Sequence, residues 1–229
     1  EYLDTVTWTI ESTKFDLIIF CENTGYRLED WEICLKAEKR GKQFEYLTFH
    51  GDDDSIQKKG KGYGEGEIIA YALKNSRLLK ERGFFCKLTG RITIKNIDRL
   101  IHKNRNYFMH VEGESKIDTR FYCVHAKDYI RVLSDTYKHV NDTKSWYLEN
   151  AFYKEITGHR LMYRAFYEVP YFVGISGSTG RSYERKRSRK AIILTNFLCR
   201  LNLYNSSKIW LLIHTVSKVK NKMGILNCL

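Results

Sequence analysis

The sequence of 229 residues has no run of about 18 apolar residues, the length that a helix needs to span a bilayer. It also has no positively charged start followed by an apolar core, which is the pattern of a secretory signal peptide. We therefore expect a cytoplasmic protein. The chain starts at Glu1 rather than at a methionine, and residues 2–10 already read as a helix that leads straight into a strand. We expect the natural chain to begin earlier, with a further strand before this helix.

Proline and closely spaced cysteines are scarce. A single proline and little low-complexity sequence argue against a linker in the middle of the chain, so we expect one main domain. No two of the six cysteines form a Cys-x-x-Cys pair, and the seven histidines show no metal-ligand spacing. Buried free thiols in a reducing compartment explain the cysteines better than disulfides or zinc. The six are Cys21, Cys34, Cys86, Cys123, Cys199 and Cys228.

Positive charge is abundant and unevenly distributed. The chain carries a net charge of +12, and residues 181–190 alone hold six lysines and arginines. An apolar run at residues 191–203 follows this block, which is typical of a basic amphipathic helix. The block indicates an anionic partner, which the sequence leaves open between nucleic acid, an acidic membrane surface and a phosphorylated substrate.

Apolar runs and helical patterns alternate through the first half of the chain. Residues 16–21 form a continuous apolar run and residues 44–49 a second strand-like run, as expected for strands buried in a parallel sheet. Residues 28–40 between them have helical spacing and end at a glycine. A glycine-rich stretch, a second helical pattern and a strand at residues 84–91 follow. This order predicts an α/β fold with a mostly parallel sheet flanked by helices.

The glycine-rich stretch at residues 59–67 reads KGKGYGEGE. Glycines let backbone N–H groups approach a phosphate, and the following helix directs the positive end of its dipole at the same point. Lys59 and Lys61 add mobile positive charge there. We expect a phosphate-binding loop, and a plain surface loop before a helix is the alternative.

Polar residues also follow the first predicted strand. Glu22 and Asn23 lie at its carboxyl end, where ligands bind in open α/β sheets. Asn23 could recognise a base or ribose edge, or it could form an Asx turn.

Glu149 is the best candidate for a catalytic base. It stands near the start of a predicted helix whose apolar stripe contains Leu148, Phe152 and Ile156. Because Glu149 lies about 100° around the helix from Leu148, it can border a cleft. A carboxylate there could take the proton from an acceptor hydroxyl, and an exposed helical glutamate without a catalytic role is the alternative.

Four segments resemble those of bacterial glycosyltransferases of the GT-A type, which build capsule, lipopolysaccharide or other surface polysaccharides. They are Cys21-Glu22-Asn23-Thr24, Lys61-Gly62-Tyr63-Gly64-Glu65, Lys87-Leu88-Thr89-Gly90-Arg91 and Trp146-Tyr147-Leu148-Glu149, and the resemblance covers residues 1–170. It implies a GT-A-like (Rossmann-like) sheet, a nucleotide-sugar donor and Glu149 as the base. The residues that it places at the donor nucleotide are Glu22, Asn23, Lys61, Gly62, Gly64, Glu65, Lys87, Thr89 and Arg91.

One segment departs from the pattern of this family. Its members commonly hold a divalent metal with an aspartate pair after the central helix, where this chain has residues 87–91. Lysine and arginine can neutralise a diphosphate directly, so we expect transfer without a metal. Asp52 and Asp54 are the alternative ligands for Mn²⁺ or Mg²⁺, although we expect them to form a polar turn.

The sequence thus predicts a glycosyltransferase that moves a sugar from a nucleotide sugar to a glycan or a lipid-linked acceptor. Residues 1–170 would form the catalytic α/β domain, and residues 171–229 a flexible loop and a basic amphipathic tail. The tail could hold the enzyme as a peripheral protein at the inner face of an anionic membrane. Two alternatives stay open: a nucleic-acid-binding module that uses the basic block, although no recognised motif is present, and a sugar nucleotidyltransferase.

Overall fold

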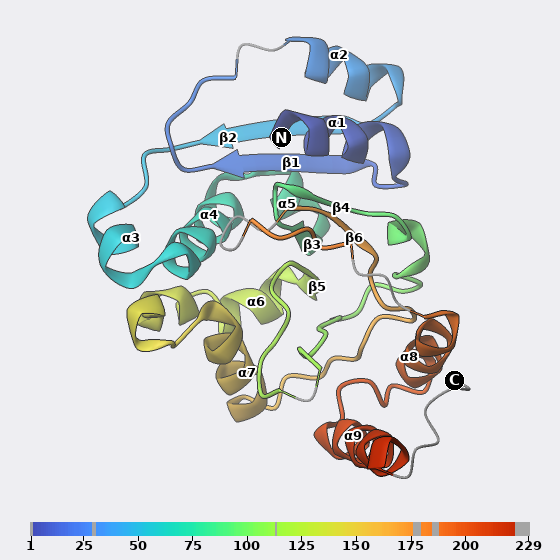
Figure 1. The fold of residues 1–229 in the computed structure, drawn as a ribbon. Coiled ribbons are helices and arrows are strands. Elements are labelled where there is room, and N and C mark those ends of the chain that lie inside the picture. Colours follow the sequence, from blue (N-terminus) through green and yellow to red (C-terminus); the bar gives the residue numbers. More distant parts are fainter. Residues whose placement is uncertain (1, 29–30, 113, 176–179, 185–187, 223–229) are drawn as a thin grey trace.

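The computed structural model describes residues 2–28, 31–112, 114–175, 180–184 and 188–222. A layer of two strands and two helices lies at one end of the molecule, and the last two helices lie at the other (Figure 1). Between them lie a group of helices and two small antiparallel sheets.

The first layer contains a parallel pair of strands and two helices. β1 (Leu17–Glu22) and β2 (Gln43–Thr48) pair in parallel along their whole length. α1 (Tyr2–Ser12) precedes them, and α2 (Trp31–Lys39) connects them. This layer confirms the predicted order of strand, helix and strand. Its own buried core consists of Val6, Ile10, Ile18, Ile33 and Ala37.

The remaining elements of the described residues form the body of the molecule and its C-terminal end. In chain order they are α3 (Asp53–Lys59), α4 (Lys61–Asn75), α5 (Arg77–Arg82), β3 (Phe84–Leu88), β4 (Ile92–Ile94), η1 (Ile97–Arg99), β5 (Phe121–His125), α6 (Ala126–Val132), η2 (Thr136–His139), η3 (Asp142–Lys144), α7 (Leu148–Gly158), β6 (Phe172–Gly174), α8 (Arg189–Arg200) and α9 (Ser207–Lys222). The elements labelled η are short 3₁₀ helices.

The prediction of a GT-A-like, mostly parallel sheet is wrong. The strands of the described residues form three separate two-stranded sheets, and both β3 with β5 and β4 with β6 are antiparallel. The described chain between β3 and β5 contains β4 and η1 but no α-helix, so it lacks the crossover that usually joins parallel strands. The apolar runs predicted strands correctly, but burial alone does not determine the direction in which strands pair.

A disulfide joins the second sheet. The register of β3 and β5 places Cys86 opposite Cys123, and the two form a disulfide with their Cα atoms 4.0 Å apart. The prediction of free thiols is therefore wrong for this pair, and the cysteines no longer support a reducing compartment. Cys228 lies outside the described residues. Among the described residues, Cys21 and Cys34 are free thiols, and Cys199 is buried.

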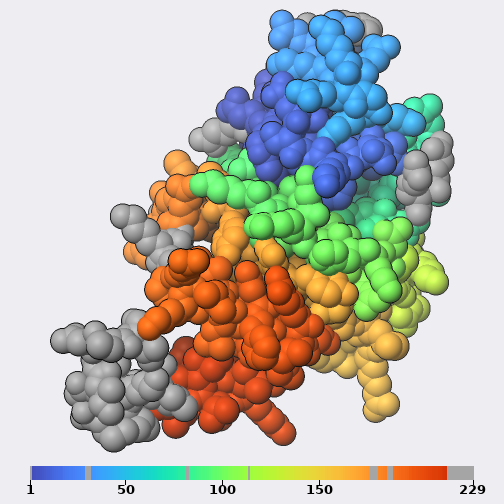
Figure 2. All heavy atoms as spheres, turned by 90° about the vertical axis from the view of Figure 1, so that its right-hand side faces the viewer, coloured from blue at the N-terminus to red at the C-terminus, as the bar shows by residue number. Residues whose placement is uncertain are grey.

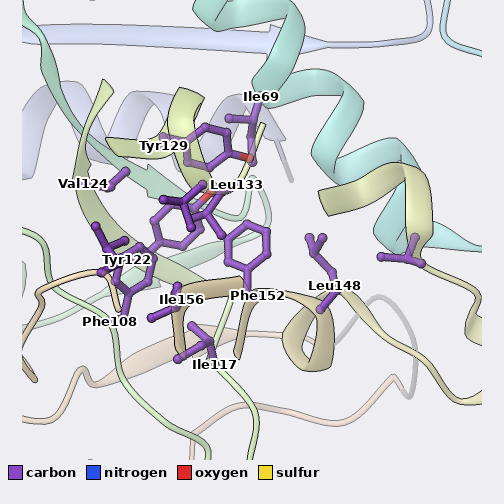
Figure 3. Packing of buried hydrophobic residues seen from close by; sticks show 14 residues of the cluster. Ile69, Phe108, Ile117, Tyr122, Val124, Tyr129, Leu133, Leu148, Phe152 and Ile156 are labelled. Carbon is purple, nitrogen blue, oxygen red and sulfur yellow. The ribbon is translucent and has the colours of Figure 1, made fainter. Parts of the chain in front are cut away.

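One large core holds α7 against β5. Tyr122 of β5, Tyr129 of α6 and Phe152 of α7 point toward one another (Figure 3), with ring centroids 5.6 to 6.4 Å apart. All three side chains are almost completely buried, as are Leu148 and Ile156 of the predicted apolar stripe. The orientation of α7 is therefore fixed by packing, and with it the position of Glu149 in its first turn.

A second core attaches the C-terminal helices to the body. Leu198 and Cys199 of α8 and Trp210 of α9 belong to one buried cluster with Tyr107 and Phe166. No helix in the described ranges is long and apolar enough to cross a membrane. The domain boundary at residue 170 stays a prediction. Residues 176–179 of the expected flexible loop and residues 185–187 of the basic block lie outside the described part of the chain.

Candidate functional site

A cleft of about 1590 Å³ brings the predicted site residues together. All of β1 and all of β3 contribute to its wall, together with the first turns of α4 and α7. Of the ten residues predicted for the donor nucleotide and the catalytic base, Gly62 alone does not line it, and the alternative metal ligands Asp52 and Asp54 do not line it either. Those that do are Glu22, Asn23, Lys61, Gly64, Glu65, Lys87, Thr89, Arg91 and Glu149.

Lys87 is held by three acceptors in the wall of the cleft. Its Nζ donates to Glu65 Oε1 at 2.5 Å, to the Thr119 carbonyl oxygen at 2.6 Å and to Thr89 Oγ1 at 2.9 Å. The side chain is only 11% exposed. Glu65 therefore already compensates the positive charge that the sequence suggested for a diphosphate.

Glu149 lies at the other end of the same chain of contacts. Thr119 Oγ1 donates to Glu149 Oε1 at 3.2 Å, so Thr119 connects Glu149 to Lys87 and, through Lys87, to Glu65. Burial raises the pKa of the Glu149 carboxyl, and the carboxylates of Glu65 and Asp118 raise it further. Hydrogen bonds from its own backbone N–H and from Thr119 only partly offset this rise. A carboxyl in a cleft whose pKa is raised holds a proton more readily than an ordinary glutamate, which suits it to proton transfer.

The glycine-rich stretch is helical and closely packed. α4 begins at Lys61, earlier than the expected start near Glu65, so Gly62, Gly64 and Gly66 lie inside a helix. A Cβ on Gly66 would lie 2.1 Å from Tyr137 Cβ, and one on Gly62 would lie 3.2 Å from Leu148 Cβ. The prediction of a loop is wrong here, because the residues from Lys61 onward are helical. The glycines instead allow neighbouring elements to approach α4 closely.

The carboxylate of Asp142 lies at the start of α4. Gly60, just before this helix, has φ +98°, and a Cβ there would lie 2.1 Å from Asp142 Oδ2. Asp142 Oδ1 is buried and has no hydrogen-bond partner among the described residues. A negative charge is favourable at the positive end of a helix dipole. Asp142 therefore lies where the sequence suggested a bound phosphate.

Glu22 stabilises the turn after β1. Its carboxylate accepts hydrogen bonds from the Thr24 backbone N–H at 2.8 Å, from Tyr46 Oη at 3.2 Å and from the hydroxyls of Thr24 and Thr48. Burial alone would raise the pKa of Glu22, but these hydrogen bonds outweigh it and lower the pKa. Asn23 follows Glu22 in this turn, and its carbonyl oxygen accepts from the Gly51 N–H at 2.9 Å.

Asp52 begins a helix. Its carboxylate accepts from the Ser55 backbone N–H at 2.9 Å and from Ser55 Oγ at 2.7 Å, which caps α3 and lowers the pKa of Asp52. In the described part of the chain, no three His, Cys, Asp or Glu side chains gather as a metal site. The expected polar turn at Asp52 is thus a helix cap.

Two polar residues that the sequence analysis missed, Thr119 and Arg120, also line the cleft. Thr119 connects Lys87 to Glu149, as described above. Arg120 donates to Asp118 through Nε at 2.9 Å and Nη2 at 2.6 Å, and its guanidinium lies 4.1 Å from the Phe172 ring centroid. The polar triplet Asp118-Thr119-Arg120 directly before a buried strand was the sequence signal that could have identified them.

Arg91 lies at the edge of the cleft. Its guanidinium is 4.8 Å from the centroid of the Tyr2 ring, and its side chain is exposed. Arg91 and Lys61 both line the cleft, on β3's C-terminal side and at the start of α4.

Comparison with known proteins identifies no relative. No protein-family model, no curated protein and no solved structure matches this chain.

Proposed function

We propose that the cleft is the active site of a glycosyltransferase in which Glu149 is the general base. The observation that carries the proposal is the position of Glu149, a largely buried carboxyl with a raised pKa that faces a cleft containing cations. Because the prediction of a mostly parallel sheet is wrong, the fold does not support a glycosyltransferase. The proposal therefore rests on the cleft and on the resemblance of the segments around Lys61, Lys87 and Glu149.

The proposed reaction is an inverting transfer. The oxygen of an acceptor hydroxyl forms a bond to the anomeric carbon of the donor sugar while the bond from that carbon to the phosphate oxygen breaks. Glu149 takes the hydroxyl proton, and the nucleotide leaves with the electron pair of the broken bond. We assign Lys61 and Arg91, which both line the cleft, to the phosphates.

The partners follow from this reaction. The donor is a nucleotide sugar, and the acceptor is a glycan or lipid-linked sugar of a surface polysaccharide. We propose that transfer takes place at a membrane surface and that it needs no divalent metal.

Two measurements test this function in order. Thermal-shift assays with UDP, GDP, CMP and dTDP, each with and without Mn²⁺, identify the nucleotide. Release of that nucleotide from its sugar donor is then measured for Glu149→Gln, which keeps the shape of the side chain but cannot accept the proton. We expect a loss of about 10²- to 10⁴-fold in rate with nucleotide binding retained.

Glu155→Gln is the matched control, because Glu155 lies on the same helix but does not line the cleft. It should turn over at the parental rate. Parental activity in a folded Glu149→Gln variant, or no stabilisation by any of the four nucleotides, would contradict the proposal.

A further inference from the structure

The C-terminal end of the chain carries almost all of the net charge. Residues 185–229 contain ten lysines and arginines and no aspartate or glutamate. The rest of the chain contains 29 lysines and arginines against 27 aspartates and glutamates, so it is nearly neutral. α8 and α9 lie side by side at the end of the molecule opposite the β1–β2 layer (Figures 1 and 2). The cations of α8 and α9 therefore lie at one end of the protein.

α8 exposes an apolar face. Ile193, Leu194, Phe197 and Leu201 are 62%, 44%, 57% and 52% exposed, and their spacing places them on one side of the helix. The side that packs on the body instead contains Thr195, Leu198 and Cys199, which are buried. The apolar residues of α8 therefore divide into a set that attaches the helix and a set that nothing in the described structure covers.

α9 repeats this arrangement. Trp210 is buried, and its Nε1 donates to the Tyr204 carbonyl oxygen at 2.7 Å. The next two residues, Leu211 and Leu212, are 69% and 59% exposed. Lys208 is exposed and lies one turn before them. Two consecutive helices thus each present leucines or aromatics to solvent beside a cation.

Two of the three cations of α8 stand where they do not help the helix, whereas the third, Arg200, lies in the last turn and pairs with Glu168 at 3.8 Å. Arg189 and Lys190 occupy the first turn of α8, which contains no acidic residue. Positive charge at this end is unfavourable because the helix dipole is positive there. This placement indicates that the charge serves a partner rather than the stability of the helix.

We infer that the exposed faces of α8 and α9 bind the surface of an anionic lipid bilayer. A bilayer surface offers negative headgroups for Arg189, Lys190 and Lys208 and an apolar interior for residues such as Phe197 and Leu211. A second copy of this chain fits poorly, because both copies would present cations and no carboxylate from residues 185–229. Nucleic acid would match the charge but would leave the apolar side chains uncovered.

This inference is independent of the proposed enzymatic function. The binding itself requires no substrate and can be measured without one.

Co-sedimentation of the full chain with vesicles tests it. We expect binding to phosphatidylcholine vesicles with 30% phosphatidylglycerol and little binding to pure phosphatidylcholine, with the affinity falling as salt is raised from 50 to 300 mM. Arg189→Gln with Lys190→Gln should weaken binding about 25-fold, since each cation contributes about fivefold near such a surface. Phe197→Ser with Leu211→Ser should weaken it at least tenfold, because these side chains would no longer enter the bilayer.

The matched control lies on α2, at the opposite end of the molecule. Leu35 is 51% exposed, and Lys39 and Arg40 are exposed nearby. Leu35→Ser with Lys39→Gln and Arg40→Gln removes the same kinds of group and should leave vesicle binding unchanged.

Three outcomes would overturn the inference. The first is equal binding to neutral and anionic vesicles, or none to either at low salt. The second is a dimer in sedimentation velocity that Phe197→Ser dissociates, which would assign the surface to a second copy. The third is loss of vesicle binding in the α2 control, or binding that tolerates both the basic and the apolar substitutions.

Discussion

In the cleft, the cations of Lys87 and Arg120 each lie against a carboxylate, whereas Arg189 and Lys190 of α8 belong to a stretch of sequence, residues 185–229, without any Asp or Glu. Lys87 is largely buried, and a buried charge is tolerated only with partners. Arg189 and Lys190 are exposed and stand at the unfavourable end of their helix. Lys87 and Arg120 therefore hold side chains in place within the protein, whereas the exposed Arg189 and Lys190 can contact a partner outside it.

The largest expected effect on stability comes from breaking the ion pair between Lys87 and Glu65 in the cleft. Lys87→Met should lower the free energy of unfolding by about 3 kcal/mol, the lower end of the range for a buried pair, because Glu65 is partly exposed. Adding Glu65→Gln should recover more than half of this loss, since no unpaired carboxylate then remains. Urea denaturation measures both variants.

A surface pair provides the control for this prediction. Lys95 and Glu184 are paired at 2.9 Å with 67% and 52% of their side chains exposed, so Lys95→Met should cost less than 1 kcal/mol. An equal loss for Lys87→Met and Lys95→Met would show that Lys87 does not hold the cleft together.

The next prediction tests whether Gly66 of α4 serves close packing or phosphate binding. Gly66→Ala should lower the free energy of unfolding by about 1 to 3 kcal/mol, because the new Cβ meets Tyr137. Gly158→Ala, in a helix where no atom lies within 4 Å of the new Cβ, should leave stability unchanged or raise it by about 0.5 kcal/mol. A stable Gly66→Ala variant that loses nucleotide affinity would favour a phosphate-binding role instead.

Two glutamates of the cleft should show opposite pH dependence. Glu149 has a raised pKa, so its contribution to stability is complete below the ordinary glutamate pKa and is lost as pH rises through the raised value. Glu22 has a lowered pKa, so its contribution is present above the ordinary pKa and is lost as pH falls through the lowered value. The stability difference between parent and variant should therefore fall with pH for Glu149→Gln and rise with pH for Glu22→Gln. Parallel slopes in denaturant titrations from pH 3 to 8 would contradict these assignments.

The smallest effect on stability is expected at α8. Arg189→Gln with Lys190→Gln should leave the free energy of unfolding unchanged or raise it by about 0.3 to 1 kcal/mol, because cations leave the positive end of the helix dipole. The measurement is urea denaturation of the same variant that is used with vesicles. A clear loss of stability would mean that these side chains serve the fold.

The strands and helices of the first half were predictable because apolar periodicity determines them locally. β1, α2 and β2 lie within a few residues of the expected ranges, and the expected helix with Glu149 is α7. Pairing direction was not predictable, since the antiparallel pairing of β3 with β5 depends on how the chain between them returns. The disulfide between Cys86 and Cys123 depends on that same pairing, so no local spacing could reveal it.

The sequence analysis named nine residues that line the cleft, but the contacts among them were not predictable. The resemblance placed Lys87 and Glu149 in one site, and both line the cleft. That Glu65 compensates Lys87, and that Thr119 connects Lys87 to Glu149, depends on contacts between residues 22 to 32 positions apart in the sequence. Glycines have the same signature in a phosphate loop and in a closely packed helix, so the sequence alone could not distinguish these two roles at Gly66.

The central claim is that Glu149 is a proton acceptor in a nucleotide-sugar cleft. The most direct test is a ¹³C NMR titration of the Glu149 carboxyl, assigned with Glu149→Gln and repeated in the presence of the nucleotides. We predict a pKa above the ordinary value, a lower pKa in Glu65→Gln because a neighbouring negative charge is gone, and a shift of the resonance when a nucleotide binds. A carboxyl that titrates in the ordinary range and does not respond to UDP, GDP, CMP or dTDP would contradict the account.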